Sequence, residues 1–298
     1  MLKPSIFPVL PRFLAVALIA SCHSAPPVTP MDVTPVSPPM ARTVPHENLN
    51  SVVWVQTSAE YRAGALQAFT AAQHALDIEL GRPQDTAAVE QTGNYASLPP
   101  AVIVDIDDTV LDNSPFEARL IESGASYSSA GWNEWVGEAR AAAVPGAVEF
   151  ARYAAARGVT VFYISNRDFS TEESTRRNLL SEGFPVDTST DVVLLRGERP
   201  EWKSDDKTPR RQEVAAHYRV LLLVGDNLGD FFTDDHSTVA QRTGIVDRYS
   251  DRWGTSWIVI PNPMYGSWEA AAINYQRSAP ADEQLRLKRS VLRTAPNR

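Results

Sequence analysis

An apolar run at residues 101–104 (AVIV) stops abruptly in acidic residues. A short run of this kind predicts a buried strand. Asp105 and Asp107 follow it, and a spacing of two places both side chains on one face of an extended backbone. Two carboxylates this close repel each other unless a cation or a shared proton lies between them. A magnesium ion at the carboxyl end of a parallel strand would relieve the repulsion and would also bind a phosphate group.

Two other interpretations of this segment compete with a magnesium site. An acidic turn after a strand is common, and a lone Asp-x-Asp pair does not distinguish the two. An EF-hand calcium loop requires Gly at its sixth position and Glu at its twelfth, where this chain has Val110 and Phe116. The calcium loop is therefore excluded, and the acidic turn is tested by whether later strands end in matching residues.

Further short apolar runs follow along the chain, separated by polar loops and helix-like segments. Alternating strands and helices predict a parallel sheet with right-handed crossovers. Ligands of such sheets bind outside the carboxyl ends of the strands, where the strand order reverses. We therefore predict an α/β fold, a three-layer sandwich around a five-stranded parallel Rossmann-like sheet with a small helical cap. The later strands are expected at 159–164, 191–195, 220–224 and 257–260.

The second and third predicted strands end in residues that suit phosphate binding. Ser165, Asn166 and Arg167 follow the second strand, and a hydroxyl and a guanidinium there could hold phosphoryl oxygens. Ser-Asn after a strand is also common helix N-cap chemistry. Lys203 and Lys207 lie in the polar stretch after the third strand. Either lysine could bind phosphate or remain a solvated surface side chain.

The fourth predicted strand ends in a second pair of acids. Asp226 and Asp230 follow Gly225, a residue that allows close backbone approach. Because parallel strands bring their carboxyl ends to one edge of the sheet, these acids should lie near Asp105 and Asp107. Matching chemistry at several strand ends favours a metal-dependent phosphate site over an acidic turn.

These residues resemble the motifs of a known family. The chain looks like a member of the haloacid dehalogenase (HAD) superfamily, and within it like the class C acid phosphatases, the bacterial lipoprotein-e-like outer-membrane phosphatases and 5'-nucleotidases. The resemblance spans about residues 48–275. It rests on the strings 105–110 (DIDDTV), 112–114 (DNS), 143–150 (AVPGAVEF), 164–167 (ISNR), 207–211 (KTPRR), 225–230 (GDNLGD) and 261–268 (PNPMYGSW).

The resemblance implies a mechanism. Asp105 would be the nucleophile that forms an aspartyl-phosphate, and Asp107 the general acid and base. Magnesium would be held by Asp105, the backbone carbonyl of Asp107 and Asp226, with Asp230 as a further candidate ligand. Gly229 departs from the family, which more often has a second acid there. This departure bears on the outer coordination of the metal.

The phosphate-binding residues implied by the resemblance come from two loops. Ser165 and Lys207 would bind the equatorial phosphoryl oxygens, and Asn166 and Arg167 would contribute to substrate binding. Lys207 is preferred because of its Lys-x-x-Arg-Arg context, and Lys203 is the alternative.

Aromatic residues near the predicted site suggest what the substrate carries. Spacings of three and four predict helix from residue 48 to about 80, and a helical insertion at about 112–145 is placed to form a cap. Trp132 and Trp135 lie on one face of that insertion, where core packing is expected for at least one of them. The resemblance favours Tyr265 as a platform for a nucleobase, with Trp132 as a second candidate.

The two ends of the chain differ from its middle. Residues 1–22 resemble a lipoprotein signal peptide whose apolar run is too short to span a bilayer, and Cys22 would be lipidated. A Pro/Thr/Ser-rich linker would span 23–47, a HAD-like phosphatase domain 48–276, and a charged, frayed or disordered tail 277–298. An ordinary signal peptide with an incidental cysteine is the alternative.

We therefore expect a magnesium-dependent acid phosphatase that hydrolyses small phosphomonoesters, including nucleoside monophosphates, and is lipid-anchored in a bacterial cell envelope. A net charge of −8 argues against duplex nucleic acid as a partner, and a homodimer is left open. The alternatives are a phosphotransferase, a narrow nucleotidase, or a non-catalytic binding or storage relative. A carbon–halogen hydrolase is disfavoured, because it would not need Asp107 or Asp226.

Overall fold

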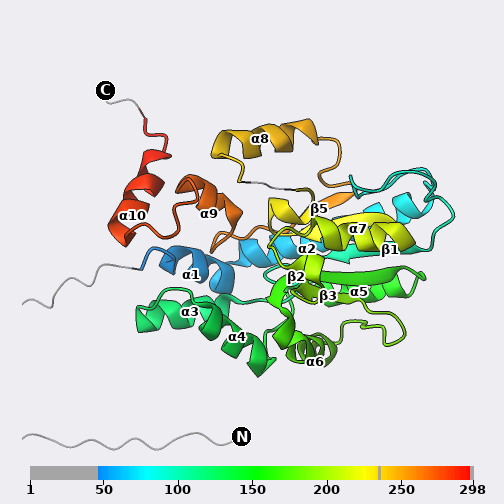
Figure 1. Ribbon diagram of the computed structural model, residues 1–298, viewed down its shortest axis with the longest axis horizontal. Coiled ribbons are helices and arrows are strands. Elements are labelled where there is room, and N and C mark those ends of the chain that lie inside the picture. Colours follow the sequence, from blue (N-terminus) through cyan, green and yellow to red (C-terminus); the bar gives the residue numbers. More distant parts are fainter. Residues whose placement is uncertain (1–45, 234–235, 296–298) are drawn as a thin grey trace, which may run out of the picture. The chain divides into compact units, whose positions relative to one another are not determined.

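The protein is described by a computed structural model that covers residues 46–233 and 236–295. The described helices and strands belong to the unit Pro45–Arg298 (Figure 1). Parallel strands form one five-stranded sheet in the order β3-β2-β1-β4-β5, which confirms the predicted fold class. The strands are β1 (Pro100–Val104), β2 (Thr160–Asp168), β3 (Val193–Arg196), β4 (Arg219–Gly225) and β5 (Trp257–Val259).

The first strand of the chain lies at the centre of the sheet. Val104, the last residue of β1, pairs with Tyr163 on β2 and with Val224 on β4. The chain leaves β1 toward β2 but leaves β4 toward β5, so the strand order reverses between β1 and β4. Loops that diverge at such a point leave room for a ligand. Asp105 and Asp226 follow these two strands directly.

Helices cover both faces of the sheet. Helices α2 and α5 contact each other, α5 contacts β2, and α2 contacts β4 and β5. Right-handed crossovers put the β1-to-β2 and β3-to-β4 connections on opposite faces, so α5 and α7 lie in the two outer layers. The helices outside the cap include α1 (Leu49–Thr57), α2 (Ala59–Leu80), α5 (Ala147–Ala155), α6 (Glu172–Glu182), α7 (Thr208–His217) and α8 (Val239–Arg248), and the short 3-10 turns are η1 (Phe169–Thr171), η2 (Pro200–Trp202) and η3 (Leu228–Asp230).

The predicted cap insertion contains two helices, α3 (Ser114–Ser123) and α4 (Ser129–Glu138). Proline in the first turn favours the start of α3, and Gly124 ends it with a left-handed φ of 64°. Helix α3 contacts α1, and α4 contacts α6 and η1. The insertion therefore follows the loop after β1 in the sequence and packs against α1, α6 and η1.

The segment expected as a frayed helix or disordered tail, residues 277–298, contains the helix α10 (Ala281–Ser290), and α9 (Ser267–Ala272) precedes it. Leu287 on α10 is buried, and Lys288 Nζ lies 2.5 Å from Glu47 Oε2 and 2.7 Å from Glu269 Oε1. These contacts hold α10 against residues far away in the sequence. Among the described residues, no helix combines the length and apolarity needed to cross a membrane.

Candidate active site

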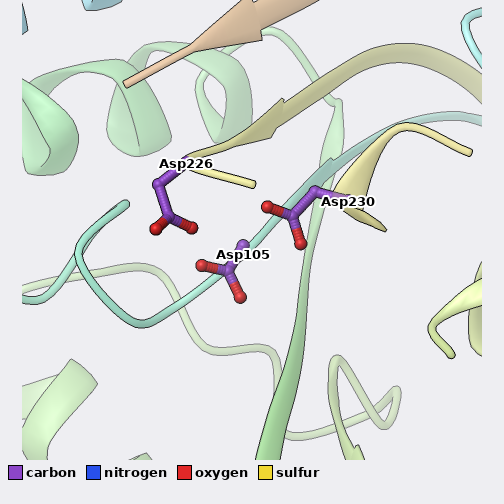
Figure 2. A group of neighbouring side chains, drawn as sticks. All are labelled: Asp105, Asp226 and Asp230. Carbon is purple, nitrogen blue, oxygen red and sulfur yellow. The ribbon is translucent and has the colours of Figure 1, made fainter. Parts of the chain in front are cut away.

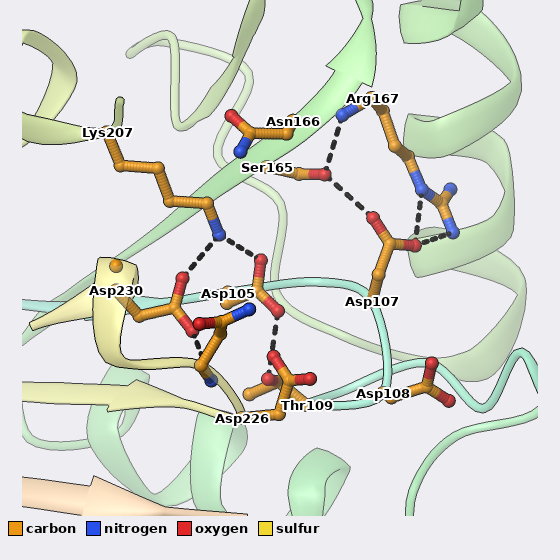
Figure 3. Close-up of polar contacts among 12 residues, drawn as sticks. Asp105, Asp107, Asp108, Thr109, Ser165, Asn166, Arg167, Lys207, Asp226 and Asp230 are labelled. Atoms are coloured by element: carbon orange, nitrogen blue, oxygen red, sulfur yellow. Dashed lines mark hydrogen bonds and ion pairs between the residues drawn. The ribbon is translucent and has the colours of Figure 1, made fainter. Parts of the chain in front are cut away.

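The side chain of Asp105 is held in place at the end of β1. It is 5% exposed, and its backbone N–H donates to the carbonyl of Val224 on β4 at 2.9 Å. Thr109 Oγ1 donates to Asp105 Oδ2 at 2.9 Å, and Lys207 Nζ donates to Asp105 Oδ1 (Figure 3). Both carboxylate oxygens thus have a partner that fixes the orientation of the group.

Asp105, Asp226 and Asp230 form a carboxylate cluster. One oxygen of each lies within 4.8 Å of one oxygen of the others (Figure 2). Asp230 accepts hydrogen bonds from Lys207 Nζ at 2.6 Å and from the Asn227 N–H at 2.9 Å, one on each oxygen. Asp226 Oδ2 accepts from Asn262 at 2.9 Å. Asp226 is therefore less engaged with other groups than Asp230 and is the better placed of the two to bind a cation.

The cluster holds more negative charge than Lys207 can balance. Burial raises the pKa of Asp105 to about 7, with the charge of Lys207 acting in the opposite direction. Burial, followed by the charges of Asp105 and Asp230, raises the pKa of Asp226 well above its usual range. Burial alone would lower the pKa of Lys207, but the two neighbouring carboxylates raise it overall. A divalent cation bound by these oxygens would remove the repulsion.

Asp107 points away from the carboxylate cluster and toward β2 (Figure 3). Its Oδ1 accepts from Arg167 Nε at 2.9 Å, from Arg167 Nη2 at 2.8 Å and from Asn113 Nδ2 at 2.9 Å. Its Oδ2 accepts from Ser165 Oγ at 2.9 Å. Arg167 is 1% exposed and binds the acid, so the structure gives it a positioning role beside the substrate-binding role that was predicted.

The structure distinguishes the two candidate lysines. Lys207 is buried and contacts the carboxylate cluster, whereas Lys203 is exposed. Asn166, a predicted substrate ligand, donates to the carbonyl of Asp205 at 2.8 Å and accepts from Arg210 Nη2 at 2.6 Å. Its side chain therefore connects the C-terminal end of β2, which extends past the predicted strand to Asp168, to the segment that carries Lys207.

Two adjacent arginines were not given a role by sequence reasoning, although they belong to the 207–211 string. Arg210 and Arg211 are fully buried. Arg210 Nη1 donates to the carbonyl of Ser165 at 2.5 Å, and Arg211 Nη1 donates to the carbonyl of Gly229 at 2.7 Å. Arg211 is also paired with Glu90 at 2.6 Å. Helix α7, which begins directly after Lys207, is thus bonded to the C-terminal end of β2 and to the turn after β4.

The two predicted aromatic residues lie in different surroundings. Tyr265 is half-buried, and its hydroxyl donates to Asp108, a buried residue with a left-handed φ of 55°. Trp132 packs edge-on against Phe116, with ring centroids 5.2 Å apart. Tyr265 therefore contacts the loop that carries Asp107, and Trp132 belongs to the packing of the cap.

Comparison with known proteins assigns the chain to a family. Residues 22–268 match the model of HAD superfamily subfamily IIIB (acid phosphatase). The chain belongs to this acid phosphatase family. It is also similar to two solved structures of the class C acid phosphatase from Bacillus anthracis, one of them with tungstate bound. Each is 32% identical with a TM-score of 0.73, over 83% of this chain and 97% of the other.

This acid phosphatase is a phosphomonoesterase, as the family and the similar structures indicate. HAD enzymes use a divalent metal, and the donor set at the site fits one, because Asp105, Asp226 and Asp230 offer only carboxylate oxygens. Four of the residues predicted from the sequence, Asp105, Lys207, Asp226 and Asp230, meet in one cluster. Asp107, Ser165 and Arg167 form a second group beside it.

Proposed function

We propose that this acid phosphatase is magnesium-dependent and that it transfers the phosphoryl group to Asp105 before hydrolysis. The observation that carries the proposal is the Asp105 carboxylate itself. It is buried at the end of the central strand, with Lys207 on one oxygen and Thr109 on the other. A carboxylate held by a cation beside further carboxylates suits attack on a phosphomonoester whose charge is neutralised locally.

The reaction would proceed in two steps. An oxygen of Asp105 attacks phosphorus, the bond from phosphorus to the ester oxygen breaks, and Asp107 protonates the leaving alkoxide. Lys207 and Ser165 bind phosphoryl oxygens, where negative charge is largest in the transition state. Asp107 then takes a proton from a water molecule, which attacks the same phosphorus and releases inorganic phosphate and the Asp105 carboxylate.

The two oxygens of Asp107 would have separate tasks. Oδ1 accepts three N–H donors from Arg167 and Asn113, which leaves it no room for a proton. Among the described residues, Oδ2 accepts from Ser165 alone. When Ser165 turns its hydroxyl to a phosphoryl oxygen, Oδ2 is free to carry the transferable proton.

Magnesium would be held by Asp105, Asp226 and the backbone carbonyl of Asp107, where it would neutralise charge on the phosphoryl group. Asp230 would act on this site through Lys207 and the Asn227 N–H, since these groups already occupy its two oxygens. Gly229, which departs from the family pattern, contributes its backbone carbonyl to Arg211.

A trapping experiment tests the nucleophile. Mixing the enzyme with a radiolabelled phosphomonoester and quenching with acid should leave label on the peptide that contains Asp105. Asp107→Asn should accumulate more label with p-nitrophenyl phosphate, because a good leaving group needs little protonation while hydrolysis of the intermediate still needs a base. Asp105→Asn should take up no label and lose activity by several orders of magnitude. Near-wild-type turnover by Asp105→Asn would contradict the mechanism.

We further propose that nucleoside monophosphates are among the substrates. Tyr265, half-buried after β5 and bonded to Asp108, is the aromatic residue that supports this proposal, whereas Trp132 packs against Phe116 in the cap. Base–aromatic stacking does not depend on base identity, so purine and pyrimidine nucleotides should both be hydrolysed. Duplex nucleic acid is not expected to bind, because the net charge is −8.

We also propose that the enzyme is lipid-anchored in a bacterial cell envelope through Cys22. The support is the sequence at 19–22 (IASC) with the Pro-rich stretch after it, which lie outside the described residues. Cys22→Ser should abolish the lipid-dependent mass increase and the partitioning into detergent. An unchanged mass and unchanged partitioning would instead indicate an ordinary signal peptide.

A further inference from the structure

The cap helix α4 is connected to Asp107 by a chain of two hydrogen bonds. Trp135 Nε1 donates to Asn113 Oδ1 at 2.8 Å, and Asn113 Nδ2 donates to Asp107 Oδ1 at 2.9 Å. Trp135 is 3% exposed and Asn113 is fully buried, so the bond between them is shielded from water, and Asn113 reaches the partly exposed Asp107 from inside the protein. The chain runs from the cap to the oxygen of Asp107 that Arg167 also holds.

The chemistry of the indole gives this chain a direction. An indole N–H can only donate, whereas a side-chain amide has one end that donates and one that accepts. By occupying the amide oxygen, Trp135 turns the NH₂ group of Asn113 toward the Asp107 carboxylate. Without the indole N–H, Asn113 Oδ1 would be a buried acceptor without a partner, and the amide would lose the contact that selects its orientation.

The indole itself is fixed by both helices of the cap. The Arg119 guanidinium, from α3, lies 5.0 Å from the centroid of the Trp135 ring. Arg119 also forms a two-pronged ion pair with Glu138 at the end of α4, with distances of 2.6 and 2.8 Å. The position of Trp135 therefore depends on how α3 and α4 pack together. Asn113 bonds both Trp135 and Asp107, so the orientation of Asp107 depends on that packing as well.

We propose that Trp135 is a positioning residue for the general acid and base Asp107, acting through Asn113. The cap then takes part in protonation of the leaving group as well as in covering the site. Anchoring Oδ1 leaves Oδ2 directed at the ester oxygen, and an acid that can rotate transfers its proton less efficiently. This inference rests on the proposed role of Asp107.

The test compares leaving groups in the full-length enzyme. Trp135→Phe keeps a buried aromatic ring but removes the N–H. It should lower kcat/KM for glycerol phosphate, whose alkoxide must be protonated, by about tenfold more than for p-nitrophenyl phosphate. Asn113→Ala, which breaks the same chain without changing the cap ring, should show the same selective loss. In an Asp107→Asn background, Trp135→Phe should add no further leaving-group dependence.

Trp257→Phe is the matched control. Trp257 is fully buried on β5, which β4 separates from β1, and its Nε1 donates to the carbonyl of Ala87 at 2.8 Å rather than to Asn113. Loss of the indole N–H at Trp257 should lower the melting temperature and change kcat/KM by the same factor for the two esters. This comparison separates a positioning effect from a general loss of packing.

If Trp135→Phe and Asn113→Ala each lower kcat/KM equally for the two esters, the inference is overturned. The proposed function survives that result if Asp107→Asn still lowers kcat/KM more for glycerol phosphate than for p-nitrophenyl phosphate. If Asp107→Asn also loses both esters equally, the assignment of Asp107 as the acid is wrong, and the inference fails with it. If Trp135→Phe does not fold, the test rests on Asn113→Ala. A larger loss of kcat/KM for glycerol phosphate than for p-nitrophenyl phosphate supports the inference, and equal losses overturn it.

Discussion

The carboxylate of Asp230 lies directly against the backbone of Gly225. A Cβ on Gly225 would come within 2.3 Å of Asp230 Oδ2 and 2.4 Å of Asp230 Cβ, which is closer than atoms can pack. This approach lets Asp230 accept from Lys207 and from the Asn227 N–H while Asp226 follows Gly225 directly. Absence of a side chain at Gly225 is therefore a requirement of the carboxylate cluster.

Gly225→Ala should disrupt this arrangement. Because the new methyl group must displace the turn that carries Asp226 and Asp230, we expect kcat/KM to fall by about a hundredfold, the size of effect that a displacement of roughly 1 Å can have. Gly244→Ala is the control, since Gly244 is exposed on α8 and its Cβ would meet nothing within 4 Å. Steady-state kinetics with p-nitrophenyl phosphate measures both, and equal activity of the two variants would contradict the steric argument.

The two acids of the β4 loop should differ in their effect on metal binding. Asp226→Asn should raise the magnesium concentration needed for half-maximal activity more than Asp230→Asn does, because Asp230 is already engaged by Lys207 and Asn227. Direct calorimetric titration with magnesium gives a second measurement that does not depend on turnover.

Removal of the metal is the complementary test. Chelation should abolish activity, and magnesium should restore it better than calcium, which prefers longer and less regular coordination. Full activity after exhaustive chelation would show that the carboxylate cluster does not work through a metal.

Arg210→Lys should impair catalysis more than its conservative nature suggests. A lysine cannot reach the Ser165 carbonyl and the Asn166 side chain at the same time, because it lacks the planar fork of arginine. We expect kcat/KM to fall by about tenfold, consistent with loss of one charge-assisted contact.

Arg219→Lys provides the comparison for this change. Arg219 is also buried and is the first residue of β4, at the opposite end of the strand from the site. It donates to the carbonyls of Glu79 and Arg82. The Arg219→Lys substitution should lower the melting temperature of the enzyme without lowering kcat. A similar drop in kcat for both variants would mean that Arg210 acts only through stability.

Glu117 predicts a pH dependence of stability. Burial raises its pKa from 4.5 to about 7, with its bond from Asn48 acting in the opposite direction. The folded state therefore binds the proton more tightly than the unfolded state, and the contribution of Glu117 to the free energy of unfolding is lost as pH rises from about 4.5 to about 7. As pH rises across this window, the free energy of unfolding of Glu117→Gln should increase relative to that of the wild type by on the order of 2–3 kcal/mol.

Denaturant unfolding at pH 5 and pH 8 measures this difference. Other titrating groups contribute equally to both proteins. Their contributions therefore cancel when the free energy of unfolding of the wild type is subtracted from that of Glu117→Gln. A difference that stays constant with pH would contradict a raised pKa at Glu117.

Tyr265 can contribute through its ring, its hydroxyl or both, and two variants separate them. Tyr265→Phe keeps the ring but removes the bond to Asp108, so it should affect nucleotides and glycerol phosphate alike. Tyr265→Ala also removes the ring and should lower kcat/KM for nucleoside monophosphates by a further tenfold to about a hundredfold, the range of base stacking. Equal losses on both substrates for Tyr265→Ala would limit Tyr265 to supporting the Asp108 loop.

The sequence by itself determined the sheet and the residues at its active edge. Short apolar runs between polar loops set where strands form, and parallel strands necessarily bring their carboxyl ends together. Asp105 directly follows such a run and Asp226 follows one after a single glycine, and this placed them at the ends of β1 and β4. These conclusions need only local patterns and a general rule of chain topology.

Only the tertiary structure decided which nearby residues come together at this edge. Lys203 and Lys207 lie in the same polar stretch, and burial between Asp105 and Asp230 selects Lys207. The bond from Trp135 to Asn113 and the helix α10, held by Glu47, depend on contacts between distant segments. A polar side chain carries no sequence pattern that names its partner, because its hydrogen bonds are set by which surfaces the packed core brings together.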